Sequence, residues 1–410
     1  MQPTLYIRLW VMVFLHYFVW GAWYVTMGTY LTKTLDFKGE QVGLAYGSTA
    51  VGALVSPFIV GIVADRFFAT QRLLACLHLI GAALLYYVST LTSFGQFYPA
   101  LLAYTVSYMA GHGLTNSLVL SHSKNPAKEF PLVMAMASVG WIVAGLVVSW
   151  LKFEDSASMF RLASGAALAM GLYSLTLPHT PPQRSGQPVS LGKLLGFDAL
   201  RLLRERSFAT FMVCSFLICV PLSFYFAWMT TFMSEFQVEN VAAKMTLGQV
   251  SDVIFLMLLP VLLPRIGAKG VLLLGIGAWA LRFGLFAAFP SQPSALWMLY
   301  LGICVHGMCY DFIFVMGRMY VDKKAGTEIR AAAQGLHAMV TLGAGMFVGS
   351  WLSGVVVQRY TTPATYDEMG VVTVAQTHAW QEIWFIPAAM SAVLVVVFAL
   401  LFREKREPGA

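Results

Sequence analysis

Twelve long apolar segments constrain this chain more than any other feature of its sequence. A helix that crosses a membrane needs about 20 mostly apolar residues. Only 11% of the 410 residues are charged and 58% are hydrophobic, whereas about 25% are charged in an ordinary soluble domain. The sequence therefore predicts an all-α membrane protein with twelve transmembrane helices. The segments fall at about 8–32, 41–63, 72–91, 97–120, 131–152, 159–178, 208–233, 243–264, 270–289, 295–320, 329–355 and 380–402.

This composition excludes several classes of protein. A mean hydropathy of +0.71 is incompatible with a cytosolic enzyme, a disordered chain or a secreted disulfide scaffold. The first apolar segment runs to about Leu31, so we interpret it as a retained span and not as a signal peptide. No HExxH or GxSxG pattern occurs, so we expect no enzyme, catalytic residue or cofactor. The cysteines form no CxxC pair, which argues against a metal site; they are Cys76, Cys214, Cys219, Cys304 and Cys309.

The longest polar interruption, residues 179–207, divides the apolar segments into two groups of six. We therefore predict an N-terminal six-helix bundle at 1–178, a basic cytoplasmic linker at 179–207 and a C-terminal six-helix bundle at 208–410. Two bundles joined by such a linker are typical of secondary transporters, which bind their cargo between the two halves.

The distribution of positive charge predicts the orientation in the membrane. Nineteen of the 26 lysines and arginines lie in loops on the side of the two termini, and six lie on the opposite side. Positively charged loops stay in the cytoplasm, so both termini are expected inside. The same bias accounts for the net charge of +7 without nucleic acid as a partner.

Two short patterns fit moving helix bundles. Gly61–Ile–Val–Ala–Asp65–Arg66 follows the second segment, and its charges at helix ends can form a cytoplasmic gate. Pairs of glycines four residues apart lie in the second segment (Gly43 and Gly47) and in the eleventh (Gly345 and Gly349). Such spacing lets helices approach closely, although each pair is also compatible with ordinary helix packing.

Polar side chains within the apolar segments mark the candidate site. Gln249 and Asp252 share one face of the eighth segment, and Asp311 follows His306 and Tyr310 in the tenth. Ionisable residues at membrane depth are costly and usually face an internal cavity. A carboxylate there can bind a proton, but Asp311 can alternatively form a structural ion pair with Arg282 of the ninth segment. His16, Trp20 and Trp23 share a face of the first segment and are equally compatible with packing.

These residues, with longer matching stretches, resemble the nucleoside:proton symporters of the major facilitator superfamily. The resemblance covers nearly the whole chain. Further matching stretches are Trp20–Gly–Ala–Trp23, Pro57 to Asp65, Leu175 to His179, Leu194 to Asp198, Ala278 to Phe283, Asp311–Phe312 and Arg330 to Gly335.

The resemblance implies a substrate site, carried over position by position. The carboxylates are retained, with Asp252 in place of a glutamate. An arginine and two amides of the family pattern are replaced by Met134, Ser223 and Phe226. The implied substrate-binding residues are Ser138, Trp141, Ser223, Phe226, Gln249, Asp252, His306, Tyr310 and Asp311.

The resemblance implies proton-coupled uptake of nucleosides by alternating access. Asp311 and Asp252 are expected to couple the proton, and Asp65 and Arg66 to form the cytoplasmic gate. We expect a monomer in the bacterial cytoplasmic membrane, with a nucleoside, a proton and lipid as its partners. Because the pocket departs from the family pattern, another neutral polar solute, such as a sugar, remains an alternative cargo.

Overall fold

The computed structural model describes residues 2–59, 68–181, 197–367, 372–374 and 376–403. Each of the twelve predicted apolar segments is helical along most of its described length. Among these described residues, seven helical stretches are individually long and apolar enough to cross a membrane, and one bent pair of helices makes an eighth. The N-terminal helices are α1 (Pro3–Gly21), α2 (Met27–Thr29), the π-helix η1 (Tyr30–Thr34), α3 (Gly39–Ile59), α4 (Thr70–Val88), α5 (Phe94–His122), α6 (Pro126–Trp150) and α7 (Ser158–Ser174).

The C-terminal elements follow the predicted order with more interruptions. They are η3 (Phe197–Arg204), α9 (Arg206–Glu235), α10 (Val241–Ala288), η4 (Phe289–Ser291), α11 (Trp297–Cys304), α12 (His306–Tyr310), η5 (Asp311–Val315), α13 (Met316–Ala338), η6 (Met339–Gly345), α14 (Met346–Arg359), β1 (Thr361–Thr362), β2 (Thr365–Tyr366), β3 (Val372–Val374), β4 (Thr377–His378) and α15 (Trp380–Leu401).

Two glycines mark turns between predicted spans, although the bounds of α10 and α13 run through these turns. Gly267 in α10 has φ 68° and Gly326 in α13 has φ 64°. A positive φ is accessible to glycine without the steric cost that other residues meet. Gly267 lies between the predicted segments 243–264 and 270–289, and Gly326 between 295–320 and 329–355. Each glycine therefore interrupts the helical backbone where the sequence predicts a change of direction.

The chain forms two compact units. Unit 1 comprises Met1–Phe37, Leu44–Leu194 and Glu239–Thr246, and unit 2 comprises Lys38–Gly43, Leu195–Val238 and Leu247–Ala410. The predicted linker 179–207 stays a prediction because residues 182–196 lie outside the described part of the chain.

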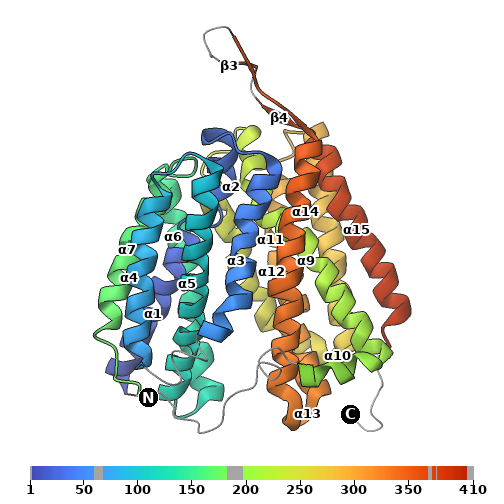
Figure 1. Ribbon diagram of the computed structural model, residues 1–410. Helices are drawn as coiled ribbons and strands as arrows, with labels where there is room; N and C mark the ends of the chain where they lie inside the picture. Colours follow the sequence, from blue (N-terminus) through green and yellow to red (C-terminus); the bar gives the residue numbers. More distant parts are fainter. Residues whose placement is uncertain (1, 60–67, 182–196, 368–371, 375, 404–410) are drawn as a thin grey trace. The chain divides into compact units, whose positions relative to one another are not determined.

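Within unit 1, α1 packs on α6 and α7, and α4 packs on α5 and α7 (Figure 1). An apolar cluster that includes Leu9, Met12, Leu74, Leu114 and Leu118 is buried among these helices. The start of α10 belongs to this unit because unit 1 binds its free N–H groups. Ala242 donates to Glu154 Oε1 at 2.8 Å and Ala243 to Ser149 Oγ at 2.8 Å, as capping side chains do at a helix N-terminus.

Within unit 2, α9 packs against α14 and α15. The start of α3 belongs here because Gly39 donates its N–H to Gln358 Oε1 of α14 at 2.5 Å. Two of the predicted small-residue positions pack very closely in this unit. A Cβ on Gly43 would lie 2.4 Å from the carbonyl oxygen of Ser350, and one on Gly349 would lie 2.7 Å from that of Cys219.

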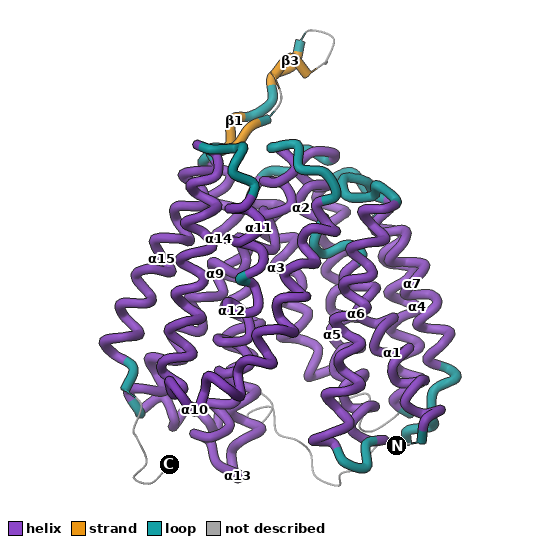
Figure 2. Tube along the Cα trace, turned by 180° about the vertical axis from the view of Figure 1, so that it is seen from behind, coloured by secondary structure: helices purple, strands orange, loops and turns teal. Residues whose placement is uncertain are grey.

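A β-hairpin that the sequence pattern does not predict joins α14 to α15 (Figure 2). Strand β1 pairs antiparallel with β4, and β2 pairs with β3 through an irregular register. Glu235 at the end of α9 binds the base of this hairpin. Its carboxylate contacts His378 Nδ1 at 2.5 Å and accepts the Trp380 indole N–H at 2.6 Å.

Candidate functional site

The predicted carboxylates lie where α10 approaches the broken helix α11–α12 of unit 2. Glycine makes this approach possible. A Cβ on Gly307 would lie 2.5 Å from the Ser251 carbonyl oxygen, and one on Gly248 would lie 3.2 Å from the His306 Cβ. The contact therefore brings the face that carries Gln249 and Asp252 next to the turn that carries His306.

Side chains from outside the helix hold the break between α11 and α12. The two helices bend by 40° at Val305. Arg282 Nε donates to the Gly302 carbonyl at 2.7 Å, and its Nη2 donates to the Ile303 carbonyl at 3.5 Å. Gly307 N–H donates to Ser251 Oγ at 2.9 Å. In a regular helix these carbonyls would accept bonds from residues four positions later, so Arg282 and Ser251 replace the interrupted bonds.

Arg282 is fully buried and lies between two aromatic rings. Its guanidinium carbon lies 4.1 Å from the centre of the Tyr225 ring and 5.0 Å from that of Trp279. Such cation–π contacts stabilise a desolvated cation. Within the described residues Arg282 forms no ion pair with Asp311. The alternative role of Asp311, a structural salt bridge, is therefore not the arrangement found.

A row of rings continues from Arg282 towards Asp311. Tyr225 stacks on His306 with ring centres 5.0 Å apart, and His306 stacks on Tyr310 at 5.9 Å. Phe226 meets the edge of His306 at 5.9 Å. Flat apolar faces of this kind suit a planar aromatic ligand.

Six buried polar atoms around this row have no hydrogen-bond partner among the described residues. Buried polar groups in proteins are nearly always paired, so a cluster of exceptions is characteristic of a site that binds a polar ligand. Asp252 lies within range of electrostatic interaction with both Asp311 and Arg282. The six atoms are Tyr225 Oη, Gln249 Oε1, Asp252 Oδ1, Arg282 Nη1, His306 Nδ1 and Asp311 Oδ2.

Ser223 is placed differently from the other predicted site residues of unit 2. Its hydroxyl donates to the Cys219 carbonyl of its own helix at 2.8 Å and lies 3.4 Å from Ser350 Oγ of α14. The hydroxyl is thus bound within the contact between α9 and α14.

The predicted residues of unit 1 form a second aromatic group. Trp141 of α6 packs on Trp20 of α1, with ring centres 5.3 Å apart. Ser138 is partly exposed one turn before Trp141 on α6. Trp23 is fully buried and stacks on Phe160, so it is a packing residue. Asp65 and Arg66, the predicted gate, lie outside the described residues.

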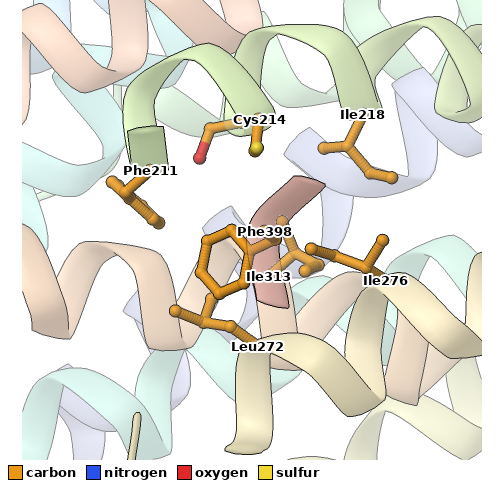
Figure 3. Close-up of a pocket in the computed structure, with 8 residues that line it drawn as sticks. Phe211, Cys214, Ile218, Leu272, Ile276, Ile313 and Phe398 are labelled. Carbon is orange, nitrogen blue, oxygen red and sulfur yellow. The ribbon is translucent and has the colours of Figure 1, made fainter. Parts of the chain in front are cut away.

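A pocket of unit 2 is lined by residues other than the predicted site residues. Figure 3 shows side chains of α9, α10 and α15 around it. Its lining is almost entirely apolar and contains none of the predicted site residues, so we interpret it as a packing defect. The lining residues are Phe211, Cys214, Ser215, Ile218, Leu272, Ile276, Ile313 and Phe398.

Residue patterns alone missed four contributors to the site. Tyr225, Ser251, Gly248 and Gly307 were not predicted, because a lone tyrosine, serine or glycine in an apolar segment is common and carries no spacing signal. The one usable sign is that each of the four adjoins a predicted site residue in the sequence.

The close approach at Gly307 leads to a testable prediction. Gly307→Ala would place a methyl group against the Ser251 backbone and the Phe255 ring. Overpacking of this kind costs about 1–3 kcal/mol, and it would also move His306 away from α10. We expect a lower melting temperature in detergent and a loss of most transport activity. Gly277→Ala in α10, where nothing lies within 4 Å, is the matched control; equal behaviour of the two variants would contradict the assignment.

Comparisons with known proteins agree along the whole chain. A family model described as "Nucleoside H+ symporter" matches residues 3–407. The putative nucleoside transporter YegT of Escherichia coli is 36% identical over 96% of this chain and 92% of its own length. The E. coli xanthosine permease is 32% identical over 98% of this chain and 96% of its own.

Solved structures confirm the predicted fold. The crystal structure of the nucleoside transporter NupG superposes with a TM-score of 0.86, at 32% identity, over 98% of this chain and 100% of that one. The peptide transporter PepTSo, at 13% identity, shares the fold with a TM-score of 0.73 over 98% of both chains. The chain therefore has the twelve-helix major facilitator fold and is a multi-pass membrane protein.

Proposed function

The chain belongs to the nucleoside H+ symporter family, and we propose that Asp311 and Asp252 of unit 2 couple its uptake of nucleosides to protons. Membership makes the protein a transporter. The observation that carries the assignment of roles is the cluster of six unpartnered polar atoms, which includes one oxygen of each carboxylate.

Asp311 is the better placed of the two carboxylates to bind the proton. Its side chain is almost fully buried, and its Oδ2 has no partner among the described residues. Burial of an unpaired carboxylate is so costly that the group favours its neutral, protonated form. Asp252 also carries a buried oxygen without a partner among the described residues, but its side chain is partly exposed, so it is the more accessible of the two to a ligand.

The cargo is recognised by a combination of rings and acceptors. Asp252 and Gln249 offer oxygen acceptors suited to the hydroxyl groups of a ribose. His306 and Tyr310 offer flat faces for a base. Two relatives carry names that state a nucleoside or xanthosine cargo, which supports this class of solute. Trp141 and Ser138 of unit 1 are proposed to complete the recognition.

Transport by this site also requires an orientation in the membrane, a gate and a conformational cycle. We infer that both termini lie in the cytoplasm, from the excess of positive charge in the loops on that side, and we propose that the protein works as a monomer. Asp65 and Arg66 would form the cytoplasmic gate. The two units would alternate access to the site, as transporters built from two repeats do.

Competition binding to the purified protein tests the cargo. We expect ribonucleosides to compete, bases to be poorly discriminated, and removal of the 2′- or 3′-hydroxyl to weaken binding about tenfold or more, since a hydrogen bond to a charged group contributes about 1.5–3 kcal/mol. Free bases and simple sugars should compete weakly.

The variant Asp252→Asn makes this test specific. It should reduce the difference between ribo- and deoxynucleosides, whereas Asp155→Asn, at an exposed position of unit 1, should leave it unchanged. If sugars compete and no nucleoside does, the cargo assignment is wrong and the alternative of another neutral solute replaces it.

A further inference from the structure

Three histidines from different helices meet inside unit 1. His16 lies on α1, His78 on α4 and His112 on α5, and these three helices lie together in the N-terminal bundle (Figure 1). His16 is fully buried and His78 nearly so, whereas His112 is partly exposed. We call these residues the histidine triad. None of the three belongs to the proposed substrate site.

The triad is a continuous hydrogen-bonded chain of imidazoles. His16 Nδ1 lies 3.1 Å from His78 Nε2, and His16 Nε2 lies 3.4 Å from His112 Nδ1. His112 Nε2 in turn lies 3.5 Å from the Tyr17 hydroxyl. His16 faces its two neighbours through different ring nitrogens, so one metal ion could not bind all three residues. Among the described residues no metal-holding group of His, Cys, Asp or Glu occurs.

This arrangement can hold an imidazolium at His16 as well as a neutral imidazole. A neutral imidazole has one donor and one acceptor, but a protonated one has two donors. Protonated His16 would donate from Nδ1 to His78 and from Nε2 to His112, so both of its N–H groups would be paired. Its ring also stacks on Tyr108 with centres 4.6 Å apart and an angle of 4°, which places a cation over an aromatic face.

As far as the chain is described, the surroundings of the triad contain other titratable groups but no charged partner. Tyr17 of α1 and Tyr108 of α5 face it, and Tyr108 donates to the His16 carbonyl at 2.9 Å. On α6, the Trp141 ring packs on Trp20, which in turn contacts the triad. Within the described part of the chain no Asp, Glu, Lys or Arg hydrogen-bonds to the triad.

The charged and titratable residues of the adjacent α6 and α7 are Lys128, Glu129, Arg161 and Tyr173. Tyr173 donates to the Arg8 carbonyl, and Glu129 accepts from the Lys124 and Asn125 N–H groups.

The exposed end of the triad adjoins the predicted substrate residues of unit 1. Trp20 meets the edge of His112 at 6.2 Å between ring centres and packs on Trp141 at 5.3 Å. On the other side, Gly111 leaves room for His78 and His16, since a Cβ there would lie 3.5 Å from His78 Nε2 and 3.9 Å from His16 Cε1.

We propose that the histidine triad is a proton-binding site in unit 1, loaded through His112 and centred on His16. A proton binds His112 Nε2, and the proton of His112 Nδ1 moves to His16 Nε2, so one proton is gained and no other bond is broken. His16 is left with both nitrogens protonated between two neutral imidazoles. The site contributes to coupled uptake, and in that respect it rests on the proposed function.

Nitrogen NMR of the full chain in lipid nanodiscs tests the site without any substrate. With ¹⁵N-labelled histidine, we expect the resonances of the three imidazoles to shift together between pH 5 and pH 8, with one proton gained in total. In His16→Gln the joint transition should disappear. His337→Gln removes a buried histidine of unit 2 that stacks on Phe211 and should leave it intact. Three neutral imidazoles throughout this range, or three independent transitions, would overturn the proposal.

Uptake into proteoliposomes tests the contribution to coupling. The ratio of uptake at external pH 5.5 to that at pH 7.5 should fall at least threefold in His16→Gln and remain unchanged in His337→Gln. If His16→Gln does not fold, His112→Gln at the partly exposed end serves as the second variant. An unchanged ratio in a folded triad variant would overturn the proposal. Failure of the unmodified protein to transport nucleosides would instead contradict the proposed function, and the NMR result would still decide whether the proton site exists.

Discussion

Asp311→Asn is expected to abolish accumulation of nucleoside against a gradient while leaving exchange across the bilayer. The amide keeps the shape of the side chain but cannot release a proton, so it resembles a permanently protonated aspartate. Each coupled proton adds about 1.4 kcal/mol of driving force, or about tenfold accumulation, per unit of pH gradient. The variant should show no accumulation above equilibrium, although it should still exchange labelled for unlabelled nucleoside.

Two measurements on proteoliposomes separate coupling from general damage. Gradient-driven uptake reports the proton, and counterflow without a pH gradient reports binding and the conformational cycle. Asp155→Asn, at an exposed position of unit 1, should behave as the unmodified protein in both. Accumulation by Asp311→Asn equal to that of the unmodified protein would remove Asp311 from the mechanism and leave Asp252 and the histidine triad as the candidates.

The sequence was sufficient to predict the helices because their signal is local. Each span is a long apolar run, and hydropathy registers such a run regardless of its tertiary partners. The predicted turns near Gly267 and Gly326 were visible for the same reason. The hairpin after α14 was not, because its strands are two or three residues long and depend on pairing across a turn.

The candidate site was only partly predictable, since its chemistry depends on contacts between distant helices. Asp252, Asp311 and His306 were identified because ionisable residues at membrane depth are rare. Ser223 was carried over from the family pattern, yet its hydroxyl is bound to the Cys219 carbonyl. His78 and His112 gave no signal in the sequence, because 62 and 96 positions separate them from His16 and only the fold brings the three rings together.

The partners of Arg282 are the clearest example of contacts that could not be predicted from the sequence. A buried arginine near a buried aspartate of the next span invites the prediction of a salt bridge. In the structure its guanidinium instead binds the Gly302 and Ile303 carbonyls and packs on Tyr225. It therefore stabilises the bend that positions His306, and it contributes to the site without pairing with Asp311.

Substitution of this arginine is therefore expected to destabilise the fold and, by that route, to disrupt the site. Arg282→Gln removes two charge-assisted bonds to carbonyls and two cation–π contacts. Charged hydrogen bonds contribute about 1.5–3 kcal/mol each and a desolvated cation–π contact about 2 kcal/mol, so we expect a larger loss of stability than in Gly307→Ala or Asp311→Asn. Thermal unfolding in detergent measures it, and nucleoside binding should be lost at temperatures where the protein remains folded. Arg265→Gln, at an exposed position of α10 before the turn at Gly267, is the control.

The double variant Arg282→Gln with Asp311→Asn distinguishes the two roles of the arginine. If the pair formed a buried salt bridge, loss of either partner would leave an uncompensated charge, and loss of both would restore much of the stability. If Arg282 holds the bend by its carbonyl contacts, removal of Asp311 cannot replace those bonds. We expect the double variant to unfold at about the temperature of Arg282→Gln alone. Recovery to the level of the unmodified protein would show that the ion pair forms in the membrane after all, and that the bend is held by other residues.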